Sequence, residues 1–274
     1  MKRFFIIGNP ISHSLSPTLH NYWFRKYNIE AEYGLLEAKE DEIKNVMNRI
    51  LKKEVLGINV TLPYKQKVIP FLSEMVNDAK DSNSVNTINL DSEGRLIGGN
   101  TDVFGFQAGY LKSMDVTERK NKKVIILGAG GVSPSIVLAL IKSNITNITI
   151  SNRTYEKSLF IKKQFKGLNI LKWEEHYDKI GDFDVIINAT SLGLKSGQNF
   201  ERFYDNVKNS SIFIDTIYNP IHTEMSKHLK SKGVQTYNGL DMFIYQGQKS
   251  FYIWNKINPE IDDELVSLLE GKMR

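Results

Sequence analysis

The chain has 274 residues and a mass of 31.4 kDa, which is long enough for two modest domains that each bury a core of their own. Apolar residues make up 41% and charged residues 24%, the balance of an ordinary soluble globular protein. The lack of cysteine excludes disulfides and thiolate metal sites and fits a reducing compartment, so we expect a cytoplasmic protein. The net charge of +5 comes from scattered lysines without a clustered stripe, which favours anionic small molecules as ligands and argues against nucleic acid.

The first hundred residues alternate between extended and helical patterns. A short apolar run at 4–7, closed by Gly8-Asn9-Pro10, predicts a first strand and not a signal peptide, and no run elsewhere is long enough to span a bilayer. Further strands are predicted at 32–37 and 55–61, with helices at 17–27, 40–52 and 67–79, and two short strands at 84–90 and 95–98 around a turn at 91–94. Such alternation indicates a mostly parallel sheet covered by helices.

The segment from 123 to 154 predicts a dinucleotide-binding unit. An apolar strand at 124–127 enters Gly128-Ala129-Gly130-Gly131, a helical stretch covers 136–141, and a second strand at 148–150 ends in Asn152-Arg153-Thr154. Glycines let the backbone approach a pyrophosphate, and the amides of the helix N-terminus favour its charge. The alternative is a tight turn that binds nothing, with Arg153 merely solvated.

The end of the second strand in this unit indicates which cofactor is preferred. An acidic residue there would accept a hydrogen bond from the ribose 2′-hydroxyl of NAD, but the chain carries Arg153. A guanidinium offers a planar fork to a 2′-phosphate, and Asn152 and Thr154 add neutral donors. The sequence therefore predicts a preference for NADP.

Strand patterns continue at 169–171, 184–188 and 212–215, and helical patterning returns from about 240 through 254 and 269. We expect an α/β protein with two domains and a cleft between them that binds the ligand. The expected division is an N-terminal domain at 1–101, a nucleotide domain at 102–238, and C-terminal helices at 239–274 that pack back on the first domain.

Three short segments of the first domain are rich in polar groups. Ser14 and Ser16 lie just before a helix, where their hydroxyls can cap the helix or bind a carboxylate. Asn59-Val60-Thr61-Leu62-Pro63-Tyr64-Lys65 ends the third strand, and alternation points Asn59 and Thr61 to the same side. A lone lysine is usually solvated, so taken by itself Lys65 is better interpreted as a surface lysine than as a catalytic one. Asn100-Thr101-Asp102 closes the domain and places Asp102 near the expected cleft.

Together these segments resemble the shikimate dehydrogenases, over essentially the whole chain. Matching motifs are Asn9 to Pro17, Asn59 to Lys65, Asn86-Thr87, Asn100 to Asp102, Gly128 to Gly131, Asn152 to Thr154, Asn188 to Thr190, Asp215 to Pro220, Gly239 to Met242, and Tyr245 to Gly247. A single glycine motif is weak evidence, but this ordered set is strong.

The resemblance implies reversible hydride transfer between NADP and shikimate, which interconverts 3-dehydroshikimate and shikimate in aromatic amino-acid synthesis. It implies that Ser14 and Ser16 hold the substrate carboxylate and that Lys65 is the acid/base, oriented by Asp102. The ring hydroxyls would be bound by Asn59, Thr61, Asn86, Asp102 and Gln246, with Tyr218 near the carboxylate and the nicotinamide. The implied cofactor-binding residues are Gly128, Ala129, Gly130, Gly131, Asn152, Arg153, Thr154, Lys157, Thr190, Gly239 and Met242.

Some positions depart from the family pattern. Lys157 stands where a second arginine is frequent, which keeps the charge but loses the bidentate fork and softens the NADP preference. Pro134 is acceptable only in the first turn of a helix, and Asp241 replaces a frequent glycine.

Two rival functions stay open. One is a quinate/shikimate dehydrogenase of broader substrate range or NAD use, and the other is a non-catalytic NADP-binding regulator, against which Lys65 and Asp102 argue together. The five histidines show no metal-ligand spacing, so no metal is expected. The partners expected are small molecules, with neither nucleic acid nor membrane, and the protein would be a monomer or a homodimer.

Overall fold

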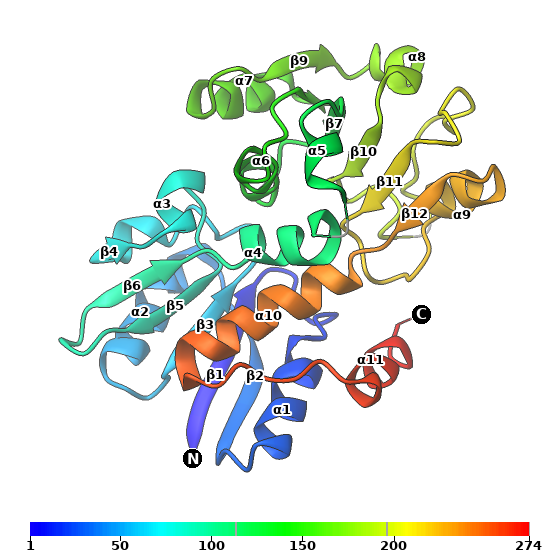
Figure 1. Ribbon diagram of the computed structural model, residues 1–274. Helices are drawn as coiled ribbons and strands as arrows, with labels where there is room; N and C mark the ends of the chain where they lie inside the picture. Colours follow the sequence, from blue (N-terminus) through cyan, green and yellow to red (C-terminus); the bar gives the residue numbers. More distant parts are fainter. Residues whose placement is uncertain (113, 196, 274) are drawn as a thin grey trace. The chain divides into compact units, whose positions relative to one another are not determined.

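The computed structural model describes residues 1–112, 114–195 and 197–273 (Figure 1). The chain divides into two compact units. Unit 1 consists of Met1–Gly105 and Ile244–Lys272, and unit 2 consists of Phe106–Phe243 with Met273. Each unit contains a six-stranded sheet of its own.

Unit 1 is built on a mixed sheet with the strand order β2-β1-β3-β5-β6-β4. β1 pairs in parallel with β2 and β3, and β4 pairs in parallel with β6, whereas β5 runs antiparallel to β3 and β6. The strands are β1 (Lys2–Gly8), β2 (Ala31–Glu37), β3 (Gly57–Val60), β4 (Glu74–Met75), β5 (Thr87–Leu90) and β6 (Leu96–Gly99). The helices are α1 (Ser16–Lys26), α2 (Ile43–Leu51), α3 (Asp78–Ser82), α4 (Asp102–Phe106, in unit 1 to Gly105), α10 (Leu240–Asn255, in unit 1 from Ile244) and α11 (Asp263–Glu270), with 3-10 turns at Glu40–Glu42 and Ile69–Phe71.

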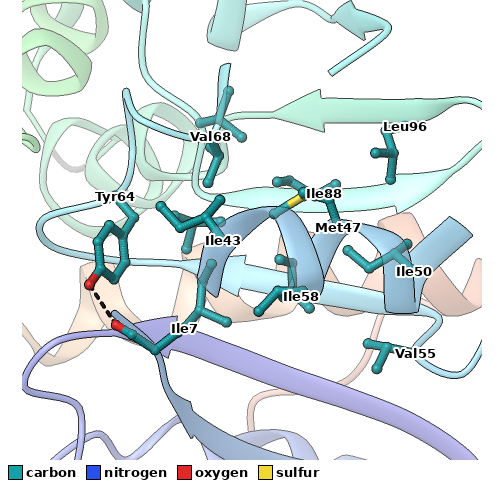
Figure 2. Close-up of a cluster of buried hydrophobic side chains, with 14 of the residues drawn as sticks. Ile7, Ile43, Met47, Ile50, Val55, Ile58, Tyr64, Val68, Ile88 and Leu96 are labelled. Carbon is teal, nitrogen blue, oxygen red and sulfur yellow. Dashed lines mark hydrogen bonds between the residues drawn. The ribbon is translucent and has the colours of Figure 1, made fainter. Parts of the chain in front are cut away.

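An apolar core of unit 1 lies between α2 and one face of the sheet, as Figure 2 shows. The predicted apolar face of α2 is confirmed, since Ile43, Val46, Met47 and Ile50 are all buried. At the edge of this core, the Tyr64 hydroxyl donates a hydrogen bond to the Ala38 carbonyl oxygen at 2.5 Å (Figure 2). The core thereby holds the turn that leads from β3 to Lys65.

Aromatic side chains from α1 and α10 pack together within unit 1. Phe4 of β1 stacks on Trp254 of α10 with 5.1 Å between the ring centroids. A Cβ on Gly57 would lie 2.6 Å from the Trp254 indole nitrogen, so only glycine lets this helix approach β3 so closely. The C-terminal segment is held on α1, where the Tyr22 hydroxyl donates to the Asp262 carboxylate at 2.8 Å.

The helix predicted over 67–79 is wrong. The structure instead has the 3-10 turn at Ile69–Phe71, the short strand β4, and α3 beginning at Asp78. Pro70 lacks a backbone N–H and disfavours a helical conformation in the residue before it, so the apolar spacing does not form a continuous helix. Glu74 and Met75 instead pair with Ile97 and Gly98 of β6.

Unit 2 has a fully parallel sheet with the strand order β12-β11-β10-β7-β8-β9. The strands are β7 (Val124–Leu127), β8 (Ile148–Asn152), β9 (Asn169–Lys172), β10 (Val185–Asn188), β11 (Ile212–Asp215) and β12 (Gln235–Tyr237). The helices are α5 (Val116–Arg119), α6 (Ser133–Lys142), α7 (Tyr155–Gln164), α8 (His176–Lys179) and α9 (Glu224–Ser231), with a π-helical segment at Gln107–Leu111 and a 3-10 turn at Ile180–Asp182. Numbered from β7, this order is 3-2-1-4-5-6, the doubly wound arrangement that binds dinucleotides.

Candidate functional site

The glycine turn of unit 2 connects β7 to α6 as predicted. Gly128 has a φ of +109°, and a Cβ there would lie 2.7 Å from the Ala189 carbonyl oxygen, so both conformation and space require glycine. The Ser133 hydroxyl donates to the Gly128 carbonyl oxygen at 2.9 Å, and Pro134 lies in the first turn of α6. The turn therefore leads into the N-terminus of a helix that is free of acidic residues in its first turn.

The end of β8 is fixed against this turn. The Ala129 backbone N–H donates to Asn152 Oδ1 at 3.0 Å, and Asn152 Nδ2 donates to the Thr154 carbonyl oxygen at 2.8 Å. Arg153, Thr154 and Lys157 are all exposed around the start of α7. The cations of Arg153 and Lys157 and the hydroxyl of Thr154 thus lie at the position where proteins of this fold bind the ribose of a dinucleotide.

A buried polar network lies at the carboxyl ends of β10 and β11. Asn188 Nδ2 donates to Asp215 Oδ1 at 3.0 Å, and the Thr223 hydroxyl donates to Asp215 Oδ2 at 2.7 Å. Burial raises the pKa of Asp215 to about 6, although its hydrogen bonds to Thr223, the Ile217 amide and Asn188 oppose the rise. Asn188 Oδ1 in turn accepts from the Thr190 amide at 3.0 Å and the Thr190 hydroxyl at 2.7 Å, which fixes the loop after β10.

The remaining predicted site residues of unit 2 are Tyr218, Gly239 and Met242, which follow β11 and β12 in the chain. The Tyr218 ring stacks on Phe243 with 4.6 Å between centroids, and Met242 is buried. Gly239 is packed against the backbone of Thr216, where a side chain would collide with the carbonyl group. In the sequence, Asn188 and Asp215 were noted only as parts of motifs that match the family. Because both residues end predicted strands, their positions could have indicated that they hold the loops after those strands.

In unit 1, Lys65 and Asp102 form a buried ion pair. Lys65 Nζ lies 2.5 Å from Asp102 Oδ2, and the two residues are 9% and 5% exposed. Asn86 Nδ2 donates to Asp102 Oδ1 at 2.8 Å, so both carboxylate oxygens are occupied. The two members of the ion pair are 37 positions apart in the sequence, and the structure brings them together at the strand ends. Lys65 is therefore not a solvated surface lysine.

The predicted hydroxyl-binding residues Asn59 and Asn86 join the same buried cluster. Asn59 Nδ2 donates to the Asn86 carbonyl oxygen at 3.1 Å and to Ser250 Oγ at 2.9 Å. Asn86 Nδ2 also donates to Thr101 Oγ1 at 2.9 Å. Ser250 and Thr101 are functional candidates that the sequence reasoning did not select as site residues.

The remaining predicted residues of unit 1 flank this cluster. Ser14 donates to Ser16 Oγ at 3.1 Å and accepts from the Ser16 amide at 3.3 Å, so this hydroxyl lies at the N-terminus of α1. Thr61 follows β3 directly, and a Cβ on Gly8 would lie 2.5 Å from Thr61 Cγ2, so glycine leaves room for the threonine. Gln246 is half-buried on α10.

Neither a metal site nor a membrane-spanning helix is found within the described residues. No group of three or more His, Asp or Glu side chains there could hold a metal ion. No helix there is long and apolar enough to cross a membrane.

The doubly wound sheet and glycine turn of unit 2 define a dinucleotide-binding α/β protein. Comparison with known proteins identifies the family: residues 6–88 match the shikimate dehydrogenase substrate binding domain, and residues 111–238 match the shikimate / quinate 5-dehydrogenase family. The chain belongs to the shikimate/quinate dehydrogenase family.

Similar proteins extend over nearly the whole chain. A protein of Pelagibacter ubique named shikimate dehydrogenase (NADP(+)) is 47% identical, covering 98% of this chain and 99% of its own length. The crystal structure of shikimate dehydrogenase from Aquifex aeolicus has a TM-score of 0.87 at 33% identity, covering 99% of this chain and 97% of that one. The Thermus thermophilus shikimate 5-dehydrogenase in complex with NADP(H) and shikimate has a TM-score of 0.85 at 27% identity, covering 99% of this chain and 98% of that one.

Proposed function

We propose that this protein is a shikimate dehydrogenase that catalyses the reversible NADPH-dependent reduction of 3-dehydroshikimate to shikimate. The observation that carries the proposal is the buried Lys65–Asp102 pair with Asn86, on a chain that also has the NADP-type glycine turn and strand end. An NADP-binding regulator would have no need of a buried proton donor. The family membership and the names of similar proteins support the same activity.

Lys65 has the position and chemistry of the acid/base. Bound NADPH would supply the hydride chemistry, and a residue beside the substrate carbonyl would have to stabilise the negative charge that develops on its oxygen. An ammonium beside that oxygen stabilises the charge and donates the proton that makes the hydroxyl. In the reverse direction Lys65 accepts the proton. Asp102, which is 2.5 Å from Lys65 Nζ and held by Asn86, keeps the lysine in one orientation.

Substrate binding is divided among the other polar residues of unit 1. Ser14 and Ser16, at the N-terminus of α1, bind the substrate carboxylate through their hydroxyls and the positive end of the helix. Asn59, Thr61, Asn86, Asp102 and Gln246 bind the ring hydroxyls. Tyr218, which belongs to unit 2, is a further proposed substrate-binding residue.

The cofactor is bound by unit 2. Gly128, Ala129, Gly130 and Gly131 accommodate the pyrophosphate at the N-terminus of α6. Asn152, Arg153, Thr154 and Lys157 recognise the 2′-phosphate, for which the exposed guanidinium of Arg153 provides the bidentate contact. Thr190 and Gly239 also bind the cofactor, and Met242 lies against the nicotinamide. We further propose a cytoplasmic enzyme, acting as a monomer or a homodimer, whose only partners in the reaction are these small molecules.

The test is a set of four assays on the purified protein, with shikimate or quinate and NADP or NAD. We expect kcat/KM to be highest for shikimate with NADP and much lower for quinate with either cofactor. Equal or better turnover of quinate would assign the chain to the broader quinate/shikimate activity. No turnover of either substrate, with NADP still bound in a fluorescence titration, would favour the regulator.

A further inference from the structure

Ser250 of α10 is a fully buried hydroxyl at the centre of the polar cluster in unit 1. Its Oγ accepts from Asn59 Nδ2 at 2.9 Å, lies 3.2 Å from Thr101 Oγ1, and donates to the Gln246 carbonyl oxygen at 3.1 Å. One side chain thus joins the helix to β3 and to the segment that precedes α4. The helix carries Gln246, β3 carries Asn59, and the segment before α4 leads directly into Asp102; all three are proposed substrate-binding residues.

Counting donors and acceptors fixes how the Asn59 side chain is oriented. The Asn86 backbone carbonyl can only accept, so the Asn59 atom 3.1 Å from it must be the amide nitrogen. The second hydrogen of that nitrogen is directed to Ser250 Oγ. On the other side, Asn59 Oδ1 accepts from the Tyr33 hydroxyl at 2.7 Å, which leaves it one further lone pair.

We propose that Ser250 is a positioning residue for substrate binding, a role that rests on the proposed dehydrogenase function. By accepting the second Asn59 hydrogen, Ser250 keeps both N–H groups engaged with the protein. Asn59 is therefore held as an acceptor for a hydroxyl of the substrate and not as a donor. Through Thr101, which accepts from Asn86 Nδ2 at 2.9 Å, the same hydroxyl supports the residue that orients Asp102.

Removal of the hydroxyl leaves a buried amide hydrogen without an acceptor. Asn59 is only 4% exposed, so water does not readily replace the lost partner, and the amide gains freedom to rotate away from its binding orientation. Lys65 and its ion pair with Asp102 do not contact Ser250 directly. The loss should therefore affect substrate binding more than the chemical step.

The experiment compares Ser250→Ala with wild type at saturating NADP. We expect the KM for shikimate to rise about five- to fifteenfold, as for loss of one buried hydrogen bond, while kcat changes less than about threefold and the KM for NADP stays unchanged. Ser250→Cys keeps a weak acceptor of similar size and should give an intermediate KM. Ser158→Ala is the matched control, because Ser158 Oγ is buried without a hydrogen-bond partner among the described residues.

A double-mutant cycle with Asn59→Ala tests whether Ser250 acts through Asn59. In the Asn59→Ala background, Ser250→Ala should change the KM for shikimate less than about twofold. A shikimate KM for Ser250→Ala within about twofold of wild type, or additive effects in the cycle, would overturn the proposal. If Ser250→Ala does not fold, Ser250→Cys carries the same comparison. A wild type that binds NADP but does not oxidise shikimate would instead refute the proposed function itself.

Discussion

Lys65 illustrates how a single side chain acquires its role from its surroundings. The residue is only 9% exposed and its ammonium is paired with Asp102, an arrangement that often stabilises a protein less than well-packed apolar residues of the same volume do. A buried pair of this kind at strand ends is typical of functional sites, where charge is placed for chemistry. The pair also explains why the sequence alone could not separate a catalytic lysine from a solvated one.

The first prediction concerns replacement of this lysine. Lys65→Ala should lower kcat by about a hundredfold or more, since a general acid contributes mainly in the transition state, and should leave the affinity for shikimate within a few-fold. Stopped-flow and steady-state assays against Lys67→Ala provide the measurement, because Lys67 is exposed and pairs with Glu40. Near-normal turnover by Lys65→Ala would remove the proton donor from the proposed mechanism.

At the scale of secondary structure, periodicity predicted most buried strands and the amphipathic helices. β7, β10 and β11 appear in the sequence as short apolar runs because both faces of a parallel strand are covered. α7 was not predicted because only Ser158 and Ile161 of its ten residues are buried, so no apolar stripe marks it. β4 and β12 have only two and three residues, too few to show any alternation.

Prediction of the site was likewise limited to what a local stretch of sequence can show. Its predicted residues were selected from ordered motifs that resemble a known family, and motifs consist of residues close together in sequence. The contact of Asn59 with Ser250 joins residues 191 positions apart, on a strand and a helix. Serine within a helix ordinarily bonds its own backbone, so nothing in the local sequence distinguished Ser250.

The second prediction concerns Arg153, which lies at the junction of β8 and α7. Arg153→Ala removes a charge-assisted contact to the 2′-phosphate, which is typically worth about 1.5 to 3 kcal/mol, or roughly ten- to a hundred-and-fiftyfold in NADP affinity. The affinity for NAD should hardly change, because NAD lacks that phosphate. Fluorescence titration of both cofactors gives the ratio, and Lys162→Ala, an exposed cation at the other end of α7, is the control. An equal loss for both cofactors would mean that Arg153 supports the local fold and does not recognise the phosphate.

For the whole molecule, stability should depend on pH through three buried groups. Burial lowers the pKa of His20 in unit 1 to about 3 and that of His176 in unit 2 to about 4, so both are neutral in the folded state. Each histidine binds a proton more readily when the chain unfolds, and stability is lost as the pH falls from about 6.5. Asp215 acts in the opposite direction: its pKa of about 6 exceeds the ordinary 3.8, so its contribution to stability rises as the pH falls from about 6 to 3.8.

The third prediction follows from adding these effects. Between pH 7 and pH 5 each histidine should destabilise the folded state by about 2 kcal/mol and Asp215 should stabilise it by about 1 kcal/mol, so these three groups together should lower the free energy of unfolding by about 3 kcal/mol. Urea denaturation at the two pH values measures this change. His20→Leu should reduce it by about 2 kcal/mol, because leucine cannot be protonated. Neither ring nitrogen of His20 has a hydrogen-bond partner among the described residues, so leucine removes no hydrogen bond there. An unchanged pH dependence in His20→Leu would show that His20 has the same pKa in the folded and the unfolded chain, so that its burial does not lower the pKa.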